Sequence, residues 1–91
     1  MTKFEIYAKL LERFGSIAQT YVAIEEMAEL QKELCKWLRG SEFGENIVEE
    51  IADVQIMLDQ LKLIFGCSDC VEHTINEKLK RTAQRYLNQI Q

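Results

Sequence analysis

The chain has 91 residues, which fit one domain, and its 47% hydrophobic content excludes a disordered chain. The net charge of −4 is divided unevenly, because residues 1–66 sum to −5 and residues 67–91 to +1. This balance argues against a nucleic-acid-binding surface across the domain. No apolar run is long enough for a membrane span and no signal-peptide core is present, so we expect a soluble cytoplasmic protein with no membrane partner.

Capping signals and glycines delimit four predicted helices, and the chain contains no proline. The first helix starts at a capping box formed by Thr2 and Glu5 and ends at Gly15. A second capping signal at Ser16 starts a helix that runs to about Arg39. We expect its buried face to carry the apolar residues that recur at helical spacing: Ile17, Tyr21, Ile24, Ala28, Cys35 and Leu38.

The second half of the chain predicts two more helices after a loop at residues 40–44. One helix runs from about Glu45 to Phe65, and the other is capped by Ser68 or Asp69 and continues towards the C-terminus. The main apolar row of the third helix, which we expect to form the core, contains Ile47, Ile51, Val54, Leu58, Leu61 and Phe65.

The fold predicted from these patterns is all-α: a single domain over residues 1–91 whose helices pack in a four-helix bundle-like manner. A domain this short buries only a thin core on its own, so we expect oligomerisation to complete it, as a dimer or tetramer. A further apolar row makes the second helix wider than one partner helix needs: Leu30, Leu34 and Trp37.

Two matching pairs of carboxylates form the most informative motif. Glu26 and Glu29 lie three residues apart on the second predicted helix, as do Glu50 and Asp53 on the third, so each pair shares a helix face. Four nearby anions cannot all stay ionised without compensation, which a divalent cation such as Mg²⁺ supplies. Because Mg²⁺ commonly also binds substrate phosphates, the motif indicates phosphate chemistry, although acidic helix faces are also commonly just solvated.

The short connection between the second and third helices makes them antiparallel neighbours. In an ideal straight hairpin, at about 1.5 Å per residue, Glu29 lies roughly 16 Å from the turn and Glu50 roughly 8 Å. A slightly longer turn, or a loop that reaches past Gly44, would close this gap and bring the two acidic pairs together.

The acidic motifs resemble the hallmark of the MazG-like all-α nucleoside triphosphate pyrophosphohydrolases, which is EExxE followed at a short distance by ExxD. The match includes the doubled acids, Glu25-Glu26 and Glu49-Glu50. A lysine and an arginine-tyrosine pair also look like those of the family's last helix: Lys78, Arg85 and Tyr86. The similarity spans roughly residues 16–87.

The resemblance implies a Mg²⁺-dependent hydrolase, with Mn²⁺ as a substitute, that cleaves the α–β phosphate bond of (d)NTPs to give the monophosphate and pyrophosphate. House-cleaning of non-canonical nucleotides is a role of this kind. Carried over residue by residue, the metal ligands would be Glu26, Glu29, Glu50 and Asp53. Glu25 or Glu49 would accept the proton of the attacking water, while Lys78 and Arg85 would hold phosphate oxygens.

The residues that would read the base are less distinctive. Gln19 and Asn46 could bind base edges but are more typical of helix caps, and four aromatic residues could stack on a base but are more typical of a core or interface: Tyr21, Trp37, Phe43 and Tyr86. Phosphoribosyl-ATP pyrophosphatases share the acidic pattern and form an alternative. A non-catalytic helical dimerisation or regulatory module is another.

A separate motif, C-x-x-C-x-x-H, is formed by Cys67, Cys70 and His73. Such a motif could hold zinc or form a redox site. No second cysteine pair completes a tetrahedron and no βαβ pattern surrounds the motif, so reduced thiols are the favoured interpretation.

Overall fold

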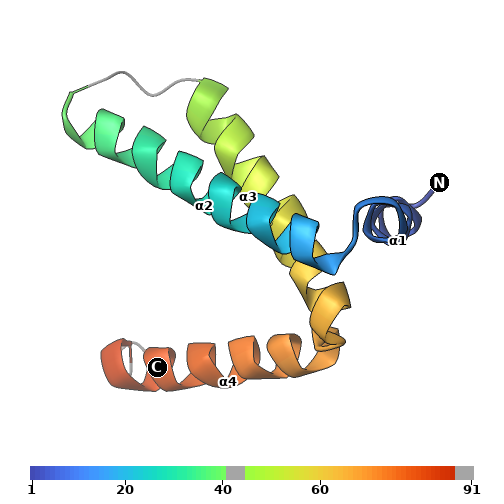
Figure 1. The fold of residues 1–91 in the computed structure, drawn as a ribbon. Helices are drawn as coiled ribbons and strands as arrows, with labels where there is room; N and C mark the ends of the chain where they lie inside the picture. Colours follow the sequence, from blue (N-terminus) through green and yellow to red (C-terminus); the bar gives the residue numbers. More distant parts are fainter. Residues whose placement is uncertain (41–44, 88–91) are drawn as a thin grey trace.

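The computed structural model describes residues 1–40 and 45–87, which form four α-helices and, within these ranges, no strand (Figure 1). The all-α prediction is confirmed. In chain order, the helices are α1 (Lys3–Phe14), α2 (Ser16–Leu38), α3 (Glu45–Phe65) and α4 (Ser68–Tyr86). Apart from Gly40, the loop predicted between α2 and α3 lies outside the described residues.

One of the three predicted helix caps forms. The backbone N–H of Glu5 donates a hydrogen bond to Thr2 Oγ1 at 3.1 Å, as the capping-box pattern predicts. The other two predicted caps are wrong, because α2 is preceded by Gly15 and α4 by Cys67, neither of which makes a side-chain cap bond. Gly15 turns the chain at a φ of +89°, where glycine is favoured, so Ser16 is already helical.

The helices α2 and α3 lie side by side in an antiparallel hairpin, which holds most of the core (Figure 1). Ala23 and Met57 are buried there together with an amide pair. Gln19 Nε2 donates a hydrogen bond to Gln60 Oε1 at 2.8 Å, and Gln60 Nε2 donates to Met57 Sδ at 3.5 Å. Because buried amides need partners, this pair favours one axial register of the two helices.

The prediction of which faces are buried is largely wrong. The apolar face expected to bury α2 is exposed throughout: Ile17, Tyr21, Ile24, Ala28, Cys35 and Leu38. On α3, Ile47 is buried and Val54 and Leu61 are half-buried, but Ile51, Leu58 and Phe65 are exposed. The helices instead meet through the neighbouring rows that contain the amide pair, so the strongest apolar rows remain outside the chain's own core.

The two outer helices, α1 and α4, are each attached to the α2/α3 hairpin at one place. Tyr7, the one buried residue among those of α1, donates a hydrogen bond from its hydroxyl to Asp59 Oδ2 at 3.2 Å. Burial, followed by the Asp59 carboxylate, raises the pKa of Tyr7 above 10.0. Among the four helices, α4 contacts only α3, contains no buried residue and turns away from the hairpin after Gly66 (Figure 1). One chain therefore does not close a four-helix bundle.

Candidate metal centre

Three of the four predicted metal ligands converge between the middle turns of α2 and α3. Glu26, Glu50 and Asp53 each offer one carboxylate oxygen, and these three oxygens lie within 4.8 Å of one another. All three side chains are half-buried. We call this group the carboxylate trio. Its spacing suits oxygen atoms that share one divalent cation, since Ca²⁺ and Mg²⁺ bind carboxylates at about 2.0–2.6 Å.

The three acids lie level with one another because α2 and α3 are offset along the hairpin axis. The start of α3 lies closer to the middle of the hairpin than the end of α2 does. Glu26 precedes the end of α2 at Leu38 by 12 residues, and Asp53 follows the start of α3 at Glu45 by eight. The difference of four residues corresponds to roughly 6 Å along the helix axis. The start of α3 is therefore offset from the end of α2 by about that distance along the hairpin axis.

Electrostatics in the trio oppose full ionisation. Burial raises the pKa of Glu26 above 4.5, and the charge and hydrogen bonding of Asp53, then the charges of Glu50 and Glu29, add to the increase. Burial also raises the pKa of Glu50, followed by the charges of Asp53, Glu29, Glu33 and Glu49. A cation bound among these oxygens would favour the ionised forms and reverse both shifts.

One oxygen of the trio is inaccessible to water and lacks a partner. Glu50 Oε2 is buried and accepts no hydrogen bond from the described residues. The ion pairs of the described residues involve Glu33 and Asp59, so they do not compensate the trio. A buried carboxylate oxygen without a donor is costly, and a bound cation is the kind of partner that would satisfy it.

The remaining predicted acids lie around the trio. Glu29 is exposed and lies outside the group whose oxygens are mutually within 4.8 Å, although its charge acts on both Glu26 and Glu50. Glu25 and Glu49, the candidate proton acceptors, are exposed beside the trio residues that follow them in the sequence. Three acids therefore form the centre, and Glu29 and Glu49 add negative charge at its edge.

The predicted phosphate-binding residues share one hollow on α4, with a volume of about 290 Å³. Lys78 and Arg85 line it together with Arg81 and Thr82, and we call it the basic hollow. Arg81 was not predicted, although its place three residues after Lys78 and four before Arg85 puts it on the same helix face. Because α4 contacts only α3 among the four helices, the basic hollow is not packed on α2 beside Glu26.

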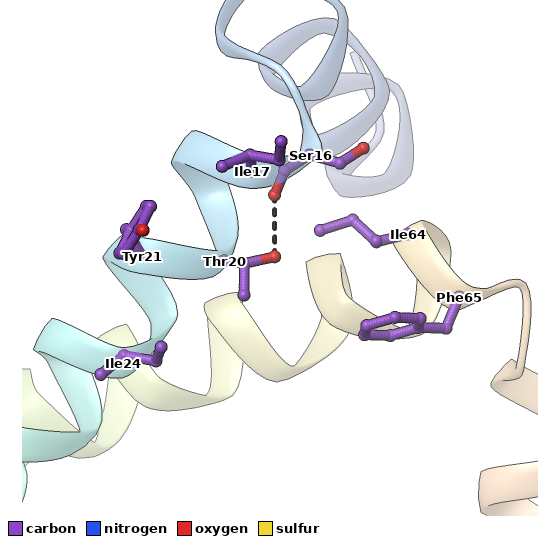
Figure 2. Close-up of a pocket in the computed structure, with 7 residues that line it drawn as sticks. All are labelled: Ser16, Ile17, Thr20, Tyr21, Ile24, Ile64 and Phe65. Atoms are coloured by element: carbon purple, nitrogen blue, oxygen red, sulfur yellow. Dashed lines mark hydrogen bonds between the residues drawn. The ribbon is translucent and has the colours of Figure 1, made fainter.

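The candidates for base recognition are scattered. Tyr21 lines an apolar groove of about 480 Å³ between the start of α2 and the end of α3 (Figure 2). Trp37 and Tyr86 are exposed at 49% and 64%, and Asn46 is also exposed, whereas Phe43 lies outside the described residues. Gln19 is buried and bonded to Gln60, so the idea that it reads a base edge is wrong.

The cysteine and histidine motif does not gather into a site. Cys67 is half-buried and Cys70 is exposed, and neither forms a disulfide with the other described cysteine, Cys35. Across residues 1–40 and 45–87, the carboxylate trio is the one group of three or more potential ligands close enough to share an ion. Cys67, Cys70 and His73 are therefore not arranged as a zinc site in this chain.

Comparison with known proteins gives no further assignment, since no family model, no curated protein and no solved structure matches the chain. None of the described helices combines the length and apolar character needed to span a membrane.

Proposed function

We propose that the protein is a Mg²⁺-dependent nucleoside triphosphate pyrophosphohydrolase that cleaves the α–β phosphate bond and releases pyrophosphate. The proposal rests on the carboxylate trio, whose oxygens converge from two helices while Glu50 Oε2 stays buried without a partner. The resemblance of the two acidic motifs to the MazG-like family supplies the reaction. Structural carboxylates on helices are usually paired with a base or fully solvated, and the trio is neither.

In this proposal, Glu26, Glu50 and Asp53 hold Mg²⁺, or Mn²⁺ in its place, and Glu29 completes the acidic edge. The bound ion supplies electrostatic stabilisation of the charge on the phosphate chain. Glu25 or Glu49, both exposed beside the centre, accepts the proton of the attacking water. Lys78 and Arg85, joined by Arg81, bind phosphate oxygens through charge-assisted hydrogen bonds.

The direct test is turnover. The purified chain with Mg²⁺ and a panel of common and modified (d)NTPs should release pyrophosphate, and Glu50→Gln should lower kcat/KM by at least about 100-fold, since even second-shell changes cost 10–100-fold. Glu12→Gln, which removes an exposed acid on α1, is the matched control and should keep full activity. Absence of turnover with every nucleotide would reject the hydrolase proposal.

Metal binding can be measured separately from chemistry. At ten times its Kd, a cation that binds only the native state adds about 1.4 kcal/mol, or roughly 6–11 °C in Tm for a domain of this size. We expect Mg²⁺ and Mn²⁺ to raise the Tm of the wild type and of Glu12→Gln, but not that of Glu50→Gln. Equal increases in all three would show that the ion binds elsewhere.

A second candidate function is a non-catalytic helical self-association module. It is favoured by the exposed apolar rows of α2 and α3, which leave the chain's bundle incomplete. In the hydrolase proposal, the same rows mediate homo-oligomerisation that completes the fold. An oligomer that binds no Mg²⁺ and releases no pyrophosphate would support the module over the enzyme.

A further inference from the structure

Two residues, Gly66 and Cys67, form the joint between α3 and α4 (Figure 1). Gly66 has a φ of +59°, and its N–H donates to the carbonyl oxygen of Leu63 at 3.2 Å. The N–H of Cys67 donates to the carbonyl oxygen of Lys62 at 3.0 Å, which completes the Schellman motif that ends α3. The carbonyl oxygen of Cys67 accepts the N–H of Val71 at 2.9 Å, which begins α4. The backbone of Cys67 therefore ends one helix and begins the next.

The thiol of Cys67 takes no part in these backbone bonds, and a second thiol lies close to it in the first turn of α4. Cys67 is the N-cap residue of α4 and makes no side-chain cap bond, and Cys70 follows three residues later. In an ideal helix, Cα atoms three residues apart are separated by about 5 Å. A disulfide usually joins residues whose Cα atoms lie roughly 4.4–6.8 Å apart. The spacing of the two cysteines therefore suits a bond between their sulfur atoms.

The third cysteine of the chain is too far away to compete for either thiol. Cys35 lies near the end of α2, whereas Cys67 follows the end of α3. Because α2 and α3 are antiparallel, Cys35 lies at the opposite end of the hairpin, roughly 30 Å away at about 1.5 Å per residue. The two thiols of the joint also differ in access, since Cys67 is half-buried and Cys70 is exposed.

Cys70 lines a hollow of about 430 Å³ at the joint, which we call the joint hollow. Its residues come from the end of α3, the joint and the first turn of α4: Lys62, Leu63, Gly66, Ser68, Asp69 and Cys70. Its volume falls in the range of about 300–1,000 Å³ that is usual for small-molecule sites. The lining offers an ammonium group, a carboxylate and a hydroxyl, so it suits a small polar molecule that carries charges of both signs.

We propose that Cys67 and Cys70 form a reversible disulfide by exchange with a low-molecular-weight disulfide that enters the joint hollow. The thiolate of exposed Cys70 attacks one sulfur of this reagent, which forms a mixed disulfide and releases one thiolate. The thiolate of Cys67 then attacks the sulfur of Cys70 and releases the second thiolate. Two protein thiols are oxidised to one disulfide, and the reagent is reduced to two thiols that take up the two protons.

The position of this disulfide suits a bond that opens and closes. The ring spans four residues, and short loops gain the least stability from closure, so the fold does not depend on the bond. The ring includes the ψ torsion of Cys67, so oxidation restricts one of the torsions that connect α4 to the hairpin. The structure describes the reduced form, in which both thiols are free. No step uses the carboxylate trio or a nucleotide, so the proposal is independent of the hydrolase.

The test incubates the reduced protein with oxidised glutathione, without nucleotide or metal, and counts free thiols by alkylation and mass spectrometry. The chain has three cysteines, so the number of alkylated thiols should fall from three to one. Peptide mapping should place the bond between Cys67 and Cys70, and excess reduced glutathione should restore all three thiols. Three free thiols after oxidation, or a bond that includes Cys35, would overturn the proposal.

Single variants test the order of attack. Cys67→Ser lacks the second thiol and should accumulate the glutathione adduct of Cys70 at least about tenfold above the wild type. Cys70→Ser should form this adduct at least about tenfold more slowly than Cys67→Ser, because the remaining thiol of the joint is half-buried. Cys35→Ser is the control and should form the disulfide as the wild type does. Equal adduct in Cys67→Ser and the wild type would contradict the second step.

A double variant tests the three-residue spacing. Cys67→Ser combined with Ser68→Cys keeps three cysteines in the chain but places the two thiols near the joint only two residues apart. Positions two apart point roughly 200° away from each other around a helix, so this variant should stop at the mixed disulfide. Circular dichroism checks that its helices are intact. A disulfide that forms as readily as in the wild type would show that helix geometry does not select the pair, and would overturn the proposal.

Discussion

Glu50 is a side chain whose position lowers the stability of the metal-free protein. Its Oε2 is buried without a hydrogen-bond partner, and its pKa is raised first by burial and then by surrounding carboxylates. The native state therefore disfavours the ionised form of Glu50 relative to a carboxyl in water, in the absence of a cation. Such a residue is expected where a bound ion, rather than the fold, supplies the compensating charge.

Metal-free stability should consequently depend on pH. Because the folded pKa values of Glu26 and Glu50 lie above 4.5, their contribution to stability is present below pH 4.5 and is lost as pH rises through the folded values. In EDTA, we expect Glu50→Gln to melt at a higher temperature than the wild type at pH 7, with the difference shrinking at pH 4. Thermal scans by circular dichroism at the two pH values measure this, with Glu12→Gln as control.

A Glu50→Gln variant that is less stable than the wild type at pH 7 in EDTA would contradict this prediction. That result would mean that ionised Glu50 makes favourable contacts in the metal-free protein.

The spacing of the acids in the sequence was enough to choose three residues of the acidic centre, but not to decide whether Glu29 belongs to it. Positions three apart share a helix face, so Glu26, Glu50 and Asp53 could be chosen from the sequence. Whether Glu29 also joins the centre depends on the axial offset of α2 and α3, which spacing within one helix does not determine. The resemblance points to Lys78 and Arg85 but not to Arg81, although helical periodicity alone places Arg81 beside them.

At the scale of elements, the Gln19–Gln60 pair joins α2 to α3 at a place where apolar packing would be expected. The amides are 7% and 1% exposed and bond to each other at 2.8 Å. Sliding one helix by a turn would separate them and leave buried polar groups without partners. The pair therefore contributes more to the choice of register than to net stability.

Substitution at this pair should be strongly non-additive. Gln60→Leu leaves the Gln19 amide buried without its partner and should cost about 1–3 kcal/mol in the free energy of unfolding. In the double variant Gln19→Leu with Gln60→Leu, both polar groups are removed and the loss should be smaller than for Gln60→Leu alone. Urea denaturation measures the wild type, Gln19→Leu, Gln60→Leu and the double variant, with exposed Gln31→Leu as control. Additive losses would show that the amides do not act as a pair.

The extent of each helix was easier to predict than its buried side. Glycines at positions 15, 40 and 66 end helices because each adopts a positive φ, and this chemistry is local. The buried side depends on the partner, and the row of Ile17, Tyr21 and Ile24 stays exposed among the residues that the structure describes. Periodicity identified surfaces that need covering, but a single sequence does not say whether the cover comes from the same chain.

The whole molecule is long and thin, with extents of 51 × 37 × 23 Å and six buried residues in the described part. With so small a core, the proposed self-association would add substantially to stability. For a dimer that unfolds to separate chains, a tenfold increase in concentration adds about 1.4 kcal/mol, which corresponds to roughly 3–5 °C in Tm. Calorimetry from 5 to 500 µM, a hundredfold range, should therefore show about twice this increase for the wild type, and a Tm independent of concentration would indicate a self-sufficient monomer.

Gly66 lies at the joint between the hairpin and α4, where a small rotation would move the far end of α4 a long way. The helix α4 joins the hairpin at this residue, which adopts a φ of +59°, and it contacts no helix other than α3 among those described. Its 19 residues form an arm of roughly 28 Å. A rotation of about 20° at the joint would swing the tip, near Arg85, by roughly 10 Å over an arm of that length. The reach of the three cations that line the basic hollow is thus governed by the torsion angles of the two connecting residues, Gly66 and Cys67.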